Sequence, residues 1–147
     1  MATLTRSSTV DAPVEEVFAY ALDIGKFWVW DGVALTAVDV KPGGTGTTAR
    51  MYTHFLGFHM EGTVEYTEVQ PDRSITAQVR FFGENPTWRF SFVPEDGSTT
   101  VIATGEWHVG VPVVGDALEG MMVKEHEAGL EAMLGHLKQQ VETKVNA

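Results

Sequence analysis

The sequence contains no cysteine among its 147 residues, which excludes a disulfide framework, a thiolate metal site and a cysteine nucleophile. It has no uninterrupted apolar run of the ~18 residues that a membrane-spanning helix needs, and no apolar leader segment near its first residues. Basic residues are scarce, since 10 Lys and Arg stand against 20 Asp and Glu for a formal net charge of -10. No basic stripe could neutralise a polyanion, so we expect no nucleic-acid partner. Because the sequence has neither the apolar run nor the leader, we expect no membrane insertion and a cytoplasmic location.

What is present is an ordinary globular composition, 44% hydrophobic and 20% charged, at the length of one domain. We therefore expect a single domain over residues 1–147, as a monomer or a homodimer. The sequence has no G-x-S-x-G and no H-E-x-x-H motif, and the GGTGT segment at 43–47 lacks the Lys-Ser/Thr pair of a phosphate loop. That segment is typical of a turn between strands, and we expect no cofactor.

The pattern of apolar residues divides the chain into strands and helices. A segment rich in Thr, Ser and Val from Thr3 to Val10 predicts an edge strand, and helical spacing over residues 14–22 predicts a short helix, followed by a second helix or turn over 24–30. From about residue 33 to 109, turn signals separate six strands, and a long helix then ends near Val141. The sequence therefore predicts an α+β helix-grip fold, in which a seven-stranded curved antiparallel sheet wraps around a long C-terminal helix, with two short helices after the first strand.

The dipeptide Asp96-Gly97 is a strong signal for a two-residue hairpin turn. It pairs Trp88 with Gly105 and places the apolar residues of both strands on one face. Because a slip of one residue would turn that whole face to solvent, the apolar pattern specifies the register. The apolar face is therefore expected to point inward.

The dipeptide Leu56-Gly57 predicts a second hairpin, in which His54 lies opposite His59 on the face away from the apolar residues. Two facing imidazoles could share a metal ion. Exposed polar side chains on the wet face of an antiparallel sheet are the more common arrangement, and we favour it. No metal site is therefore expected.

The run VDAPVEEVFAYALDIGKFWVW at residues 10–30 resembles the opening of the START-like (SRPBCC) superfamily, which includes the polyketide cyclase/dehydrase group and the plant pollen-allergen-type binders. The GTGT segment at 44–47, VEYTEVQPDR at 64–73 and the terminal helix extend the resemblance over nearly the whole chain. The resemblance implies a deep cavity between the curved sheet and the last helix. It brings no catalytic motif, because members of the superfamily range from enzymes to carriers.

The inner face of the predicted sheet and the apolar stripe of the last helix supply the candidate ligand-binding residues. They are Met51, Thr53, Met60, Tyr66, Val79, Phe81, Trp88, Phe90, Phe92, Trp107, Leu118, Met122, His126 and Met133. The helix stripe also includes Gly129, Leu130, Leu137 and Val141. Small residues such as Gly105 among the large ones indicate either interlocked packing or space for a ligand, and the resemblance favours space.

His126 lies near the centre of the helix stripe, so we expect its ring to be largely buried. A histidine on an apolar helix face is more often a structural residue than a catalyst, but imidazoles titrate near neutrality and suit general acid–base catalysis. His126 and Tyr66 are therefore the candidate catalytic residues. An enzyme would be favoured if Tyr66, Glu119 or Glu125 lay within hydrogen-bond distance of His126.

These residues lead to two main functional hypotheses. The first is a carrier or sensor that binds a hydrophobic or aromatic small molecule, lipid- or polyketide-like, in the cavity between sheet and C-terminal helix. The alternative is a cofactor-independent cyclase, dehydratase or aromatase, because aldol cyclisation and water loss of a polyketide-like substrate need only proton transfers and an enforced conformation. A protein–protein adaptor is a third, less favoured hypothesis. With one inward imidazole and no inward carboxylate, the sequence favours binding.

Overall fold

The computed structural model describes the backbone of residues 2–29, 34–55, 58–80, 85–107 and 115–146, and the side chains of these ranges except 2, 34, 37, 53–55, 58, 60, 115–123 and 125. The elements in chain order are β1 (Ala2–Val10), α1 (Val14–Leu22), α2 (Ile24–Phe27), β2 (Ala34–Asp39), β3 (Thr48–Phe55), β4 (Phe58–Gln70), β5 (Ser74–Arg80), β6 (Thr87–Glu95), β7 (Ser98–Trp107) and α3 (Gly115–Val145). The strands form one seven-stranded sheet in the order β1-β7-β6-β5-β4-β3-β2, with antiparallel neighbours throughout. The predicted helix-grip fold is confirmed.

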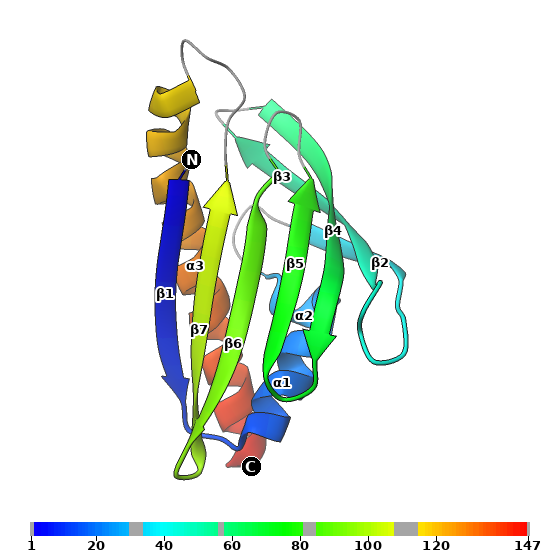
Figure 1. The fold of residues 1–147 in the computed structure, drawn as a ribbon, viewed down its shortest axis with the longest axis vertical. Helices are drawn as coiled ribbons and strands as arrows, with labels where there is room; N and C mark the ends of the chain where they lie inside the picture. The colour runs from blue at the N-terminus through cyan, green and yellow to red at the C-terminus, as the bar shows by residue number, and fades with distance from the viewer. Residues whose placement is uncertain (1, 30–33, 56–57, 81–84, 108–114, 147) are drawn as a thin grey trace.

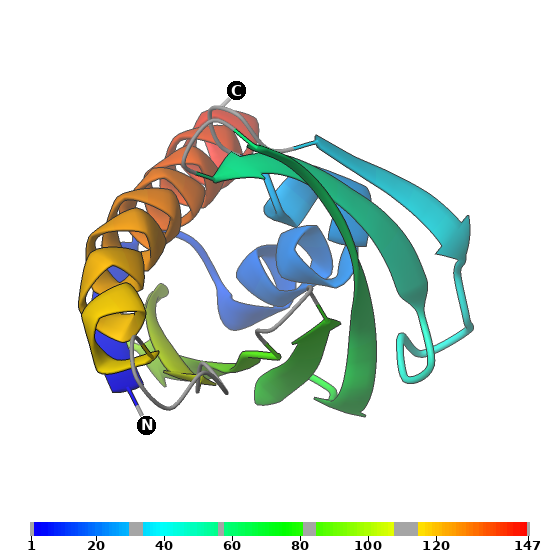
Figure 2. The same cartoon turned by 90° about the horizontal axis from the view of Figure 1, so that it is seen from above.

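The sheet curves around the helices, with β1 and β2 at its two edges (Figure 1). Seen from above, the curve holds α1 and α2 on its inner side, and α3 runs along the side near β1 (Figure 2). Along the strands, α1 and the C-terminal end of α3 lie near the β6–β7 hairpin, whereas α3 begins at the opposite end (Figure 1). The two ends of the concave face therefore have different helical neighbours.

Both predicted hairpin registers are confirmed. Trp88 pairs with Gly105 and His54 pairs with His59. Asp96 and Gly97 take positive φ angles of 45° and 86°, as the two central residues of a type I′ turn require. The described residues that were predicted to face inward are buried along the sheet, which confirms which face is apolar.

The two short helices add a second apolar layer to the concave face. Their buried side chains, together with the residue after α2, are Val17, Phe18, Ala21, Ile24, Phe27 and Trp28. The second helix ends at Phe27, so it is shorter than the segment 24–30 that the sequence predicted. The aromatic residues of this layer determine which part of the concave face is filled, as described below.

The long helix α3 extends four residues beyond the end near Val141 that the sequence predicted. Its described buried residues are Gly129, Leu130, Met133, Leu134, Leu137 and Val141. The predicted stripe omitted Leu134, although it lies one turn after Leu130 and so belongs to the same face. Among the described residues, no helix is both long enough and apolar enough to cross a membrane, and this includes α3.

Side chains of α3 bond to the backbone at the end of β1. The Lys138 ammonium donates to the Thr9 carbonyl at 2.7 Å, and the Asp11 backbone N–H donates to the Glu142 carboxylate at 2.8 Å. The Asp11 N–H, and then Lys138, hold the pKa of the Glu142 carboxyl below its usual value, so this carboxylate stays ionised at neutral pH. These bonds attach the C-terminal half of α3 to the edge strand.

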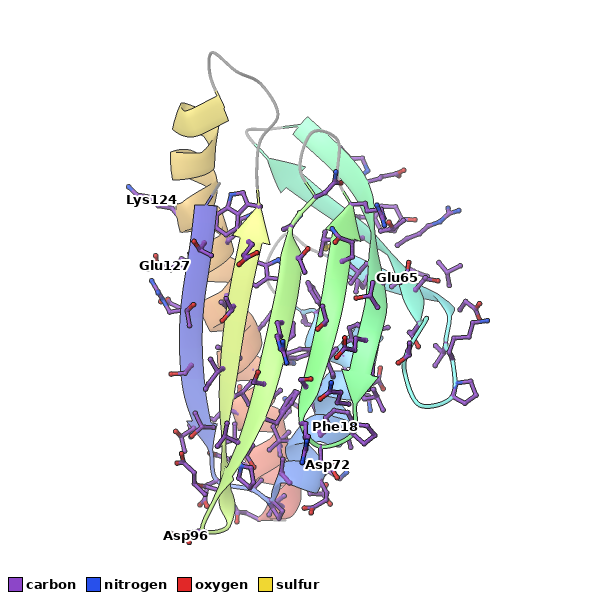
Figure 3. All side chains as sticks on the ribbon, viewed as in Figure 1. Phe18, Glu65, Asp72, Asp96, Lys124 and Glu127 are labelled. Carbon is purple, nitrogen blue, oxygen red and sulfur yellow. The ribbon has the colours of Figure 1, made fainter. Side chains whose placement is uncertain are left out.

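A further contact lies nearer the middle of α3. Arg6 on β1 pairs with Glu127, with 3.0 Å between Nη2 and Oε2. Figure 3 shows Lys124 extending away from the sheet, and its side chain is exposed. On either side of His126, Lys124 is therefore solvated and Glu127 contacts the edge strand.

Candidate functional site

Trp88, Trp107 and His126 form an aromatic cluster at the end of the sheet away from the β6–β7 turn. Trp88 lies near the start of β6, Trp107 ends β7, and His126 comes from α3. The centroid of the His126 ring lies 4.5 Å from that of Trp107 and 5.6 Å from that of Trp88, and the two indole centroids are 6.2 Å apart. Both indoles are buried, whereas His126 is half-buried. The burial that we expected for the histidine ring is therefore only partial.

Gly105 explains how the Trp88 indole fits into this cluster. A Cβ atom at position 105 would overlap the six-membered ring of Trp88, its cross-strand partner. The indole therefore packs directly against the backbone of β7. Of the two alternatives that the sequence left open for this glycine, the structure supports interlocked packing.

The indole nitrogen of Trp107 is a hydrogen-bond donor for which the described residues supply no acceptor. Trp107 is 2% exposed, and within the part of the chain that the structure describes its Nε1 is buried without a hydrogen-bond partner. An unsatisfied buried donor costs about 1–3 kcal/mol. Since an indole N–H can only donate, the group that satisfies it must be an acceptor.

The other end of the concave face is filled by aromatic side chains of α1 and α2. Phe90 packs edge-on against Phe27 and Trp28, with ring centroids 4.7 and 5.8 Å apart, and Phe92 packs in the same way against Phe18 at 5.4 Å. Edge-to-face contacts at these distances are favourable and close-packed. Phe90 and Phe92 were candidate ligand-binding residues, but this geometry gives them a packing role in the core.

Tyr66 joins the sheet to both short helices. Its hydroxyl donates to the carbonyl of Ala21 at 2.7 Å and accepts the indole N–H of Trp28 at 3.1 Å. The last carbonyl groups of a helix lack partners within the helix, so Tyr66 satisfies one of them at the end of α1. Burial raises the pKa of the Tyr66 hydroxyl, which keeps the donating proton in place. This candidate catalytic residue therefore has the geometry of a structural hydroxyl.

The remaining candidates fall into two groups. Met51, Val79 and Met133 are buried as predicted. The side chains outside the described residues are those of Thr53, Met60, Phe81, Leu118 and Met122, together with Glu119 and Glu125. The predicted cavity depends on these side chains and stays a prediction. The packing role of Phe18, Phe27 and Trp28 was not predicted from the sequence. The two adjacent aromatic residues at 27–28 were the feature of the sequence that could have indicated this role.

The outer histidine of the β3–β4 hairpin lies where the sequence predicted. The His59 side chain is 57% exposed, with its Nε2 3.6 Å from Oε1 of Glu61 and its ring stacked on Tyr52. The side chain of His54 lies outside the described residues. Across the described residues, no three His, Asp or Glu side chains gather as a metal site would require.

Comparison with known proteins identifies the family. Residues 1–142 match the family model described as polyketide cyclase / dehydrase and lipid transport. The chain belongs to this family. The resemblance to the START-like superfamily and its polyketide cyclase/dehydrase group is thereby confirmed. A search of curated proteins finds no significant match to the sequence.

Solved structures share the fold at low sequence identity. A protein from Thermus thermophilus superposes with a TM-score of 0.77 at 18% identity, covering 97% of this chain and 99% of that one. The Zhui aromatase/cyclase from Streptomyces sp. R1128 gives 0.76 at 15% identity, covering 95% of each chain. A START superfamily protein from Mycobacterium smegmatis gives 0.73 at 17% identity, covering 94% and 98%. At these identities the likeness establishes the fold alone.

This member of the polyketide cyclase/dehydrase and lipid transport family also has a groove of about 460 Å³ between α1, α2 and the C-terminal half of α3. Polar and charged residues line much of it, including Tyr20, His136, Gln140 and Lys144. Lys144 is exposed and lies 3.4 Å from the Glu16 carboxylate. The groove lies on the outer side of the helices, and both polar and apolar side chains line it.

Within this family's fold, the aromatic cluster can hold a flat apolar group against its rings and donate one hydrogen bond. The indoles of Trp88 and Trp107, which pack against the His126 ring, do not exchange protons with an imidazole at neutral pH. Tyr66 is engaged by Ala21 and Trp28. Neither indole, nor the engaged Tyr66 hydroxyl, therefore serves His126 as a second acid or base.

Proposed function

We propose that this protein binds a hydrophobic or aromatic small molecule, lipid- or polyketide-like, between the concave face of the sheet and α3. The observation that carries the proposal is the half-buried His126 ring on two buried indoles, at the end of the concave face away from the β6–β7 turn. Small-molecule sites are mostly apolar, with few polar groups that orient the ligand. The family's description, which names lipid transport, agrees with this proposal.

The filled end of the concave face supports the same location. Phe90 and Phe92 contact the aromatic residues of α1 and α2, and the Tyr66 hydroxyl is already satisfied. Close-packed interiors leave little room for a ligand at such a place. The Trp88, Trp107 and His126 cluster is therefore the part of the described face to which we assign the ligand.

The catalytic alternative, a cofactor-independent cyclase, dehydratase or aromatase, has less support. The Streptomyces protein of the same fold is an aromatase/cyclase, which is the reason to consider it. Acid–base catalysis of cyclisation needs groups that give and take protons, and His126 is the one such side chain in the described cluster. Turnover of a polyketide-like substrate that is lost in His126→Gln would establish the alternative.

Binding can be tested with the neutral apolar probe N-phenyl-1-naphthylamine, whose emission rises in apolar surroundings. We expect one molecule to bind per chain. His126→Glu should weaken binding at least about tenfold, because a carboxylate would have to be desolvated beside the ligand. Fluorescence titration with native mass spectrometry measures both quantities.

His136→Glu is the matched control, since His136 lies on the same helix, is also half-buried and lines the groove between α1, α2 and α3 instead. It should leave the probe's affinity unchanged within about twofold, as surface substitutions do. The proposal fails if the folded protein binds no probe, or if both variants weaken binding equally. If the probe binds as expected, native mass spectrometry of protein from its own host would identify the natural ligand.

A further inference from the structure

The Trp107 indole N–H is a buried hydrogen-bond donor that the described residues leave without an acceptor. Nε1 is buried, and no described group accepts its hydrogen bond. Burial of an unpaired donor lowers the stability of the fold, so native proteins rarely keep one without a partner from outside the chain. The half-buried His126 ring lies against the same indole, so the cluster that contains this donor is partly open to solvent.

We propose that the Trp107 N–H donates a hydrogen bond to an oxygen atom of the bound ligand, and that it thereby selects apolar molecules with a carbonyl oxygen over hydrocarbons of the same shape. This inference rests on the proposed binding function and adds the ligand's chemical class and the residue that recognises it. An indole N–H accepts nothing, so a ligand hydroxyl could bond only through its oxygen.

The surroundings of the donor favour a neutral oxygen on a flat ligand. The described rings beside Trp107 are those of Trp88 and His126, and the two indoles lie within 25° of parallel. Flat rings favour stacked or edge-on contact with another flat ring. A ligand carboxylate would bring a charge that is costly to bury without a paired cation. An aromatic ketone satisfies both conditions.

The pair 9-fluorenone and fluorene tests the inference, because the two planar tricyclic molecules differ at one carbon, a carbonyl in the first and a methylene in the second. The preference is the ratio of the affinity for fluorenone to the affinity for fluorene. We expect this ratio to be about tenfold higher in the wild-type protein than in Trp107→Phe, because one hydrogen bond to a buried donor contributes about that much. Comparison of the ratio between variants cancels the different water solubilities of the two ligands. Trp88→Phe, which removes an indole from the same cluster but keeps the Trp107 N–H, should retain the wild-type preference.

A second measurement follows ligand binding in the wild-type protein itself. The chain has four tryptophans, so a proton–nitrogen correlation spectrum should show four indole N–H signals. One of them, assigned by selective labelling or by its loss in Trp107→Phe, should shift downfield when fluorenone binds and much less with fluorene. Two results would contradict this inference when both ligands bind. One is an equal preference for fluorenone in wild type and Trp107→Phe, and the other is a Trp107 signal that responds equally to fluorenone and fluorene. Either would show that the donor has another partner. If neither ligand binds the folded protein, the proposed binding function itself is wrong.

Discussion

Tyr66→Phe is expected to lower the free energy of unfolding by about 3 kcal/mol, because it leaves two buried groups without partners. The Ala21 carbonyl loses its donor and the Trp28 N–H loses its acceptor, while the ring still fills its place in the core. Each unsatisfied buried group costs about 1–3 kcal/mol. The change should appear as a lower midpoint in urea unfolding with an unaltered slope.

Tyr20→Phe provides the matched control for this prediction. The Tyr20 hydroxyl donates to the Lys26 carbonyl at 3.2 Å, but Tyr20 is half-buried at the surface groove and water can replace the lost bond. It should cost less than about 1 kcal/mol. Equal losses in the two variants would show that the Tyr66 hydroxyl does not join the sheet to the short helices.

Gly105→Ala is expected to destabilise the protein by about 2 kcal/mol, because overpacking of a filled core forces side chains off their rotamers. The added methyl group would occupy the position of the Trp88 ring, which must then move against Trp107. Near-ultraviolet circular dichroism should therefore change along with stability, since it reports on the packing of the indoles. Retained stability with an unchanged spectrum would mean that Trp88 does not rest on Gly105.

Gly135→Ala is the opposite case and serves as the control. Gly135 is exposed in the middle of α3, and a Cβ there would meet nothing within 4 Å. Alanine in a helix interior is more favourable than glycine by about 1 kcal/mol. The same change of one methyl group should therefore stabilise the protein at position 135 and destabilise it at position 105.

The strand register could be predicted from sequence because side chains alternate between the two faces of a strand. A slip of one residue at the Asp96-Gly97 turn would expose Trp88 and Phe90 together, so few alternatives compete with the observed pairing. The long helix was predictable for a similar reason, since its apolar residues recur at helical spacing. The strand register is therefore set by the apolar alternation together with its turn, and the helix by the spacing of its apolar residues.

The placement of the short helices could not be predicted in the same way. Hydrophobic attraction is non-directional, so the apolar face of α2 could cover any apolar part of the sheet. The whole fold decides that Phe27 and Trp28 pack on Phe90. It also decides that the Trp28 indole N–H reaches the Tyr66 hydroxyl. The unused donor of Trp107 escapes sequence reasoning too, because whether a buried group has a partner depends on all of its neighbours at once.

The pairing of β1 with β7 affects how the chain must fold. Val10 pairs with Thr99 and Ala2 with Trp107, so the first strand to leave the ribosome bonds to the last strand of the sheet. Closing so long a loop costs chain entropy before any contact is gained, so a distant pairing of this kind forms slowly. During synthesis the apolar sides of β3 to β6 are made before α3 exists to cover them. A nascent chain that stops before β7 therefore exposes the apolar face of β2 to β6, and chaperone binding is expected to matter most at that stage.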